Sequence, residues 1–168
     1  MSFKEISATE LHENPFDLIG KKWMLVTAGD ENKCNTMTAS WGGIGVLWNK
    51  NVVFSFIRPQ RYTFSFIEEK EYYTLSFYEE EYRPILNLCG KLSGRNIDKI
   101  KETGFTPLFD QKAPYFAQAS LVLVCRKLYG QFIDPACFIE SKLESNYEKK
   151  DYHKMYVGEI VKVLSKDS

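Results

Sequence analysis

The sequence contains few of the residues on which most metal and hydrolytic sites depend. There are only two histidines, His12 and His153, and the four cysteines are widely separated, with no CxxC pair. This spacing argues against a zinc site and a thioredoxin-type motif, so we expect no metal. No Ser-His-Asp arrangement can be proposed from so few histidines, which disfavours hydrolytic chemistry. The cysteines are interpreted as free thiols, and Cys125, in the apolar run 121–125, as a small core residue.

The chain also lacks net charge and long apolar runs. Its 22 Lys and Arg residues balance 22 Asp and Glu residues, so no basic field favours nucleic acid. No apolar run approaches the roughly 20 residues that cross a bilayer, and the first residues, Met1 to Glu5, lack the apolar core of a signal peptide. The sequence therefore predicts a cytoplasmic protein that binds neither nucleic acid nor membranes.

Short β-prone segments recur along the 168 residues, which predict a single domain over 1–168. The predicted strands are 23–28, 34–41, 46–48, 52–57, 72–77, 119–133 and 155–164. Between them, helical composition or short helical turns occur at 14–19, 80–88, 96–103 and within 135–147. This order predicts a mainly β fold with inserted helices, a closed or partly closed antiparallel barrel.

Two glycine-containing segments do not match nucleotide-binding motifs. Gly42-Gly43-Ile44-Gly45 departs from GxGxxG and is expected between strands, so a Rossmann unit is not predicted. Gly90-Lys91-Leu92-Ser93 fails as a P-loop because Ile85 stands where the first glycine is required.

Hydroxyl side chains alternate with apolar ones along 34–41. Because successive side chains of a strand point to opposite faces, three hydroxyls share one face, those of Thr36, Thr38 and Ser40. The opposite face carries Met37, Ala39 and Trp41, of which Trp41 is interpreted as a core or interface residue. The hydroxyl face can contact a polar ligand or be the solvent face of an amphipathic strand, and the pattern leaves both open.

Two arginines follow the strand 52–57, in Arg58-Pro59-Gln60-Arg61-Tyr62-Thr63. Pro59 stiffens this loop, and Thr63 is placed to be the N-cap of a short helix. Guanidinium groups and helix-terminal N–H groups both suit a phosphate, so the loop predicts a phosphate clamp. The alternative is a pair of solvated arginines or an ion pair with a neighbouring carboxylate such as Glu68.

The segment 87–95 is rich in polar and flexible residues, and its glycines allow a ligand to approach the backbone closely. Equally, it can be a helix C-cap followed by the N-cap of the next helix, with Ser93 or Asn96 as the cap. His153 is the one candidate catalytic residue, either a hydrogen-bond donor at a cofactor edge or an ordinary strand-edge residue.

Together these segments resemble the flavin reductase-like family of FMN-binding split barrels, which includes the flavoredoxins. The resemblance is carried by 35–42, 58–63, 89–95 with Asp98-Lys99, and 155–160. It implies a six-stranded antiparallel split barrel with Greek-key connections. It also implies a homodimer that holds FMN at or near the dimer interface.

The same resemblance assigns cofactor-binding residues. Those implied at the isoalloxazine are Thr38, Ala39, Ser40 and Trp41, and Thr36 of the same strand is also predicted to bind the cofactor. Those implied at the phosphate and ribityl chain are Arg58, Gln60, Arg61, Tyr62 and Thr63, and those that close the site are Cys89, Lys91 and Ser93. A dianion needs charge-assisted donors and a flat ring needs a slot, which agrees with these residue types.

The activity that the resemblance implies is hydride transfer from NAD(P)H to the flavin, followed by electron delivery to an acceptor. Such chemistry requires orientation and electrostatics rather than a protein acid or base. No nicotinamide-binding motif is recognisable, so NAD(P)H enters through the resemblance alone. The alternative is a non-enzymatic FMN-binding or electron-relay protein. A barrel that binds oligonucleotides or sugars is disfavoured by the balanced charge.

Overall fold

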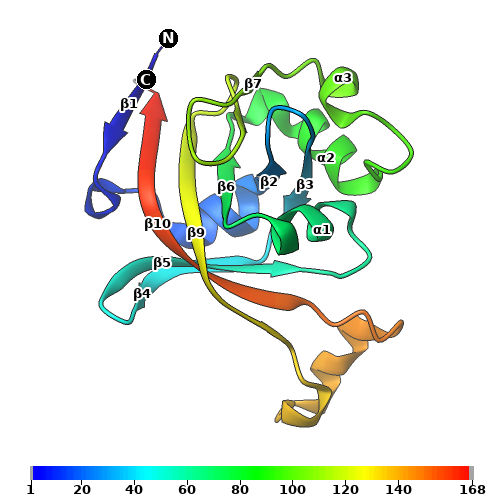
Figure 1. The fold of residues 1–168 in the computed structure, drawn as a ribbon. Coiled ribbons are helices and arrows are strands. Elements are labelled where there is room, and N and C mark those ends of the chain that lie inside the picture. Colours follow the sequence, from blue (N-terminus) through cyan, green and yellow to red (C-terminus); the bar gives the residue numbers. More distant parts are fainter. Residues whose placement is uncertain (1, 167–168) are drawn as a thin grey trace.

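The computed structural model describes residues 2–166, and its centre is one antiparallel sheet (Figure 1). The strand order is β3-β2-β6-β9-β10-β5-β4, and β1 pairs with β10. The strands of this sheet are β1 (Phe3–Ile6), β2 (Met24–Gly29), β3 (Cys34–Ala39), β4 (Gly42–Leu47), β5 (Lys50–Ile57), β6 (Tyr72–Phe77), β9 (Leu121–Phe132) and β10 (Lys154–Lys166). A separate two-stranded sheet consists of β7 (Pro107–Leu108) and β8 (Tyr115–Phe116).

The large sheet curves without closing. Its two terminal strands are consecutive in the chain, since β3 ends at Ala39 and β4 begins at Gly42, yet the hydrogen-bonded pairings within residues 2–166 do not join them. The connection from β5 through α1 (Tyr62–Glu69) to β6 crosses to a distant position in the strand order. The predicted antiparallel split barrel is confirmed, with eight strands in the hydrogen-bonded sheet rather than six.

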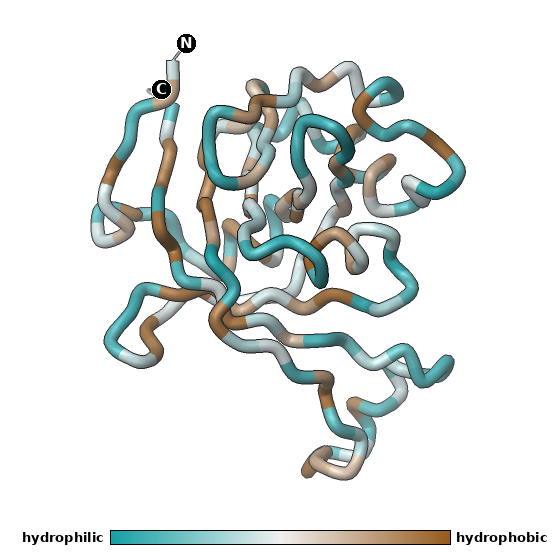
Figure 2. The backbone as a smooth tube through the Cα atoms, in the orientation of Figure 1, coloured by the Kyte–Doolittle hydropathy of each residue, from teal (hydrophilic) through white to brown (hydrophobic). Residues whose placement is uncertain are grey.

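Both faces of the sheet are buried at its central strands, where alternate residues enter different apolar clusters. Leu121, Leu123 and Cys125 of β9 join one cluster, and Val122 and Val124 join the other. Helix α1 packs on the first, whereas α2 (Arg83–Lys91) packs on the second. Figure 2 shows hydrophobic residues along the paired parts of β9 and β10 and hydrophilic ones in the surrounding loops. The prediction of Cys125 as a core residue is confirmed.

The helices of the second half begin later than predicted. A 3-10 turn, η3 (Glu80–Tyr82), precedes α2, and α2 continues to Lys91, so Cys89 and Gly90 are helical rather than in a loop. Helix α3 (Lys99–Thr103) has Asp98 as its N-cap, and Gly104 ends it with φ 67°. Neither Ser93 nor Asn96 is therefore the cap, because the Asp98 carboxylate accepts from the first-turn N–H groups.

The hairpin of β4 and β5 turns earlier than predicted. Its turn residues are Trp48 and Asn49, with φ 52° and 58°, and Lys50 and Asn51 already belong to β5. A two-residue hairpin connection of this kind needs positive φ at both central positions, which Asn adopts readily and Trp does not. Pairing of the flanking strands outweighs that preference, and it also places Gly42 to Gly45 in β4 rather than between strands.

The remaining helical segments are short. They are η1 (Ala8–Glu10), the π-helical η2 (Phe16–Lys22) in place of the turn predicted at 14–19, η4 (Pro135–Cys137) and η5 (Ser141–Tyr147). The last two lie on an arm that connects β9 to β10 and projects from the barrel, yellow to orange in Figure 1. No helix within residues 2–166 combines the length and apolar character needed to cross a bilayer.

Candidate functional site

A cavity of about 180 Å³ lies where β3 ends, beside the end of β5 and the start of β10. Antiparallel pairing sets Lys154 opposite Ile57, so His153 arrives beside the loop that follows β5. The lining residues are Met37, Thr38, Ala39, Ser40, Trp41, Phe56, Arg58, Arg61 and His153. Two guanidinium groups, one imidazole, one indole and a strand edge therefore meet at one place.

Arg58 is held by the projecting arm. Its guanidinium forms an ion pair with Asp151 at 2.8 Å and donates to the Asn146 carbonyl at 3.0 Å. The same group lies over the Tyr147 ring, 4.9 Å from its centroid. Asp151 also accepts from the Gln60 side chain. Glu68 does not pair with Arg58, because it accepts from Lys154 and Tyr156 instead.

Arg61 has a different environment, without a carboxylate partner among the ion pairs of residues 2–166. Its Nη1 donates to the Gly90 carbonyl at 3.0 Å and its Nη2 to the Cys89 carbonyl at 3.2 Å. Burial lowers the pKa of Arg61, but a guanidinium remains charged at neutral pH. Of its five N–H donors, these bonds use two. The remaining donors and the uncompensated charge suit an anionic ligand.

Helix α1 begins directly after Arg61, and no side chain of residues 2–166 caps its N-terminus. Thr63 is not the N-cap that the sequence predicted: its hydroxyl is buried and accepts from Asn35 Nδ2 at 2.8 Å. Arg61 takes the cap position with extended backbone. First-turn N–H groups without a side-chain acceptor add to the positive potential of the two arginines and favour an anion here.

His153 is buried, with 7% of its surface exposed. Burial, with a smaller contribution from the positive charge of Arg58, lowers its pKa to about 4. The imidazole is therefore neutral at pH 7. Its Nδ1 and the Tyr147 hydroxyl are 2.8 Å apart, and its ring centroid lies 5.4 Å from that of Trp41. The arm thus fixes His153 and Arg58 through the same tyrosine.

Strand β3 is an edge strand, and among residues 2–166 it pairs only with β2. The hypothesis that its hydroxyls face solvent is wrong for Thr36, whose hydroxyl is buried against Thr27 Oγ1 at 2.8 Å. The Thr38 hydroxyl donates to the Leu86 carbonyl of α2. Lys99 Nζ donates to the Thr36 carbonyl, which places that carbonyl on the edge away from β2. By the alternation of antiparallel strands, the backbone groups of Thr38 face the same outer edge.

Other sequence-predicted residues lie outside the cavity lining: Thr36, Gln60, Tyr62, Thr63, Cys89, Lys91 and Ser93. Tyr62 lines a different cavity, where Lys33 and Arg95 lie over its ring. Cys89 is buried and contributes its carbonyl to Arg61. Lys91 is exposed at the end of α2. Ser93 accepts from the Arg95 backbone N–H at 3.2 Å.

Sequence reasoning missed four residues near the arginines: Phe56, Asn146, Tyr147 and Asp151. Asn146 and Tyr147 belong to the segment 135–147, whose composition predicts a loop and a short helix with charges facing water, and Asp151 lies just beyond that segment. They reach the site because the arm folds back as β10 starts. That contact is between residues far apart in sequence, and no local pattern indicates it.

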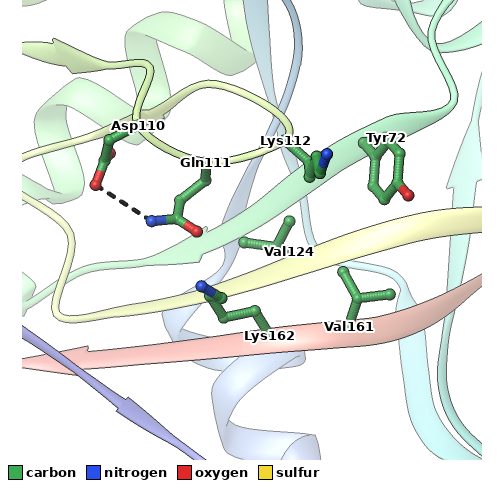
Figure 3. Close-up of a pocket in the computed structure, with 7 residues that line it drawn as sticks. All are labelled: Tyr72, Asp110, Gln111, Lys112, Val124, Val161 and Lys162. Atoms are coloured by element: carbon green, nitrogen blue, oxygen red, sulfur yellow. Dashed lines mark hydrogen bonds between the residues drawn. The ribbon is translucent and has the colours of Figure 1, made fainter.

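Larger cavities lie elsewhere. The cavity that Tyr62 lines, of about 530 Å³, also contains Lys33, Arg95 and Lys99, but neither Arg58 nor Arg61. Another, of about 500 Å³, is lined by Tyr72, Asp110, Gln111, Lys112, Val124, Val161 and Lys162 (Figure 3). In it, Gln111 donates to Asp110 at 3.2 Å, and no sequence-predicted site residue takes part. Within residues 2–166, no group of three or more His, Cys, Asp or Glu side chains is arranged to hold a metal ion.

Comparison with known proteins gives one family and many structural neighbours. A family model described as "Flavin reductase like domain" matches residues 16–168. A flavoredoxin of Desulfovibrio vulgaris (Miyazaki F) has a TM-score of 0.67 and 22% identity, over 98% of this chain and 78% of that chain. An FMN-binding domain of a flavin reductases-like enzyme from Shewanella baltica has a TM-score of 0.70 and 15% identity, over 98% and 77%.

A third neighbour is an NADH:FAD oxidoreductase of Streptomyces globisporus in complex with NAD and FAD fragments. Its TM-score is 0.65 and its identity 15%, over 86% of this chain and 74% of that chain. No curated protein sequence matches.

Proposed function

This chain belongs to the flavin reductase-like family, and from that premise we propose that it binds FMN in the cavity between β3 and Arg61 and acts as an oxidoreductase. The observation that carries the proposal is the environment of Arg61. A guanidinium with no carboxylate partner in residues 2–166 stands at the uncapped N-terminus of α1. Such a place favours a phosphate dianion.

The residues present fit FMN. Arg58 and Arg61 supply charge for the phosphate, and the nearby carboxylate, Asp151, is already occupied by Arg58 and Gln60. The Trp41 indole, half exposed at 50%, offers a flat apolar surface beside the strand edge. Backbone groups of an edge strand can bond the polar edge of a ring system. When bound, FMN supplies the hydride-accepting chemistry, and the protein supplies orientation and electrostatics.

In this proposal His153 is a neutral hydrogen-bond donor. The pKa of the Tyr147 hydroxyl is raised, chiefly because burial removes it from water. The hydroxyl therefore keeps its proton. We assign that proton to the bond with His153 Nδ1, which leaves His153 Nε2–H as the donor. A neutral donor beside the cavity can orient a cofactor carbonyl without adding a charge.

The proposal includes a homodimer. The cavity of about 180 Å³ in one chain is smaller than the roughly 300 to 1,000 Å³ of usual ligand sites. A second copy would supply the missing wall. Large apolar side chains are exposed at the cavity and on the arm, among them Trp41 at the cavity and Ile139 and Leu143 on the arm. Their burial between two copies is consistent with that arrangement.

Hydride transfer from NADH or NADPH, followed by electron transfer to a flavin, metal complex or protein acceptor, completes the proposed activity, which takes place in the cytoplasm. The alternative is an FMN-binding electron-relay protein that does not oxidise NAD(P)H. The flavoredoxins among the structural neighbours support this second candidate. The NADH:FAD oxidoreductase among them supports the first.

The visible absorption spectrum of the purified protein tests both candidates. We expect flavin bands, present as purified or after loading with FMN, that bleach when NADH or NADPH is added without oxygen. Bands that persist with both donors but bleach with dithionite favour the electron-relay function. A protein that cannot be loaded with FMN contradicts the whole proposal.

A further inference from the structure

Lys99 is a buried lysine, with 4% of its surface exposed, at the start of α3. Its ammonium donates to the Thr36 carbonyl at 2.8 Å and to the Cys89 carbonyl at 2.7 Å. It therefore joins the edge strand β3 to the C-terminal turn of α2. A buried charge is costly unless hydrogen-bonded, so these two carbonyls account for its position.

The carbonyls at the end of α2 require partners from outside the helix. The last four carbonyls of an α-helix have no intrahelical donor, and here the Leu88 carbonyl accepts from the Leu92 N–H. The Cys89 carbonyl accepts from both Lys99 and Arg61, and the Gly90 carbonyl from Arg61. Cations at this end also interact favourably with the helix dipole.

Lys99 and Arg61 thus share one acceptor, the Cys89 carbonyl oxygen, which can accept two hydrogen bonds. Lys99 anchors that oxygen to β3 through its second bond, to Thr36. Arg61 then projects from a fixed point into the cavity that Thr38 and Ser40 also line. Loss of Lys99 would remove one of the two donors to the Cys89 carbonyl, together with the bond that ties this carbonyl to Thr36 of β3.

We propose that Lys99 is a positioning residue that fixes the Arg61 guanidinium through the shared Cys89 carbonyl, and thereby makes the site prefer FMN to the unphosphorylated flavin riboflavin. This inference rests on the proposed function, because it assigns Arg61 to the phosphate. Lys99 itself does not line the cavity.

The charges around Lys99 agree with a site built for an anion. Burial lowers the pKa of Lys99 to about 8; the neighbouring Cys89 thiol acts in the opposite direction and the positive charge of Arg61 in the same direction. Two cations therefore converge on one carbonyl, and an approaching phosphate relieves their repulsion. Riboflavin, without a phosphate, gives no such relief.

A double-mutant cycle with two ligands tests the proposal. FMN and riboflavin affinities are measured by fluorescence titration for the wild type and for Lys99→Met, Arg61→Ala and the double variant. We expect Lys99→Met to raise the Kd for FMN about tenfold and to leave the Kd for riboflavin within about twofold. In the Arg61→Ala background, Lys99→Met should no longer change the Kd for FMN. Lys101→Met, on the exposed side of the same helix, is the matched control.

Several results would overturn the inference. Equal losses for FMN and riboflavin would make Lys99 merely structural, and additive effects in the cycle would deny its action through Arg61. If Lys99→Met does not fold, Lys99→Gln, whose amide NH₂ keeps hydrogen-bond donors without the charge, takes its place. Failure of the wild type to prefer FMN would instead contradict the phosphate role of Arg61, and with it the proposed function.

Discussion

Asn35 and Thr63 join the two elements that form the candidate site. The Asn35 amide donates to the Thr63 hydroxyl at 2.8 Å, and both side chains are buried. Asn35 lies near the start of β3, and Thr63 lies in the first turn of α1. The bond therefore sets the distance between the strand edge that would meet the flavin ring and the helix end that would meet its phosphate.

Gly94→Ala tests this bond. A Cβ at Gly94 would lie 2.1 Å from Asn35 Oδ1 and 2.9 Å from Tyr62 Cδ1, so the Asn35 amide must move. We expect the free energy of unfolding to fall by about 1–3 kcal/mol, as in other overpacked sites, with weaker FMN binding. Chemical denaturation measures the first effect and flavin titration the second. Gly20→Ala, with nothing within 4 Å of the added Cβ, is the control, and equal stability of the two variants would refute the expectation.

The two arginines should contribute unequally to FMN binding. Asp151 already offsets the charge of Arg58, whereas the partners of the Arg61 guanidinium in the described part of the chain are two carbonyls. We expect Arg61→Ala to raise the Kd for FMN by at least about tenfold, more than Arg58→Ala does, since a hydrogen bond to a charged group contributes roughly 1.5–3 kcal/mol. The double variant should lose FMN while remaining folded by circular dichroism.

Arg126→Ala removes a guanidinium that pairs with Glu159 outside the cavity, and it serves as the control for the arginine variants. Stoichiometric flavin in the purified double variant would exclude the phosphate clamp.

Trp41 and Trp48 allow a matched comparison, since their exposed fractions are similar, 50% and 55%, but only Trp41 lines the cavity. We expect Trp41→Ala to raise the Kd for FMN about three- to tenfold, the effect of losing an aromatic contact of about 0.5–1.5 kcal/mol. Trp48→Ala should leave the Kd for FMN unchanged. Both variants are compared at a protein concentration at which they have the same oligomeric state. Equal effects would place the flavin ring elsewhere.

His153 makes stability depend on pH. Its pKa of about 4 in the folded protein lies below the 6.5 of a free histidine, so the unfolded chain binds the proton more strongly. The contribution of neutral His153 to the free energy of unfolding is therefore fully present above about pH 6.5 and is lost as the pH falls toward 4. Because solvent partly screens the imidazole, we expect less than the full effect of this pKa difference. The free energy of unfolding should fall by on the order of 2 kcal/mol between pH 7 and pH 4.

Urea denaturation at pH 7 and pH 4 measures this dependence. His153→Asn should show a smaller decrease between the two pH values than the wild type does. His12→Asn, at the other and exposed histidine, should behave as the wild type. Parallel curves for all three proteins would show that His153 is not the group responsible.

Much of the fold was predictable because it depends on local patterns. The β-prone residues of 23–28 and 72–77 predict strands, and the apolar run that becomes β9 is long enough to be recognised. The helix ends were less predictable. Asp98 competes with Ser93 and Asn96 as a cap, and only the accepted hydrogen bonds decide between them. Trp48 has positive φ because strand pairing outweighs its backbone preference.

The sequence by itself determined the antiparallel barrel, the presence of two arginines in a stiff loop, and the family resemblance, because each is encoded in residues close together along the chain. Only the tertiary structure decided which residues share the cavity. It turned Thr63 toward Asn35, held Arg58 with Asp151 of the arm, and set Lys99 and Arg61 on one carbonyl. Those contacts join residues 10 or more positions apart in the chain, and side-chain direction at a strand edge or helix end depends on what packs against it.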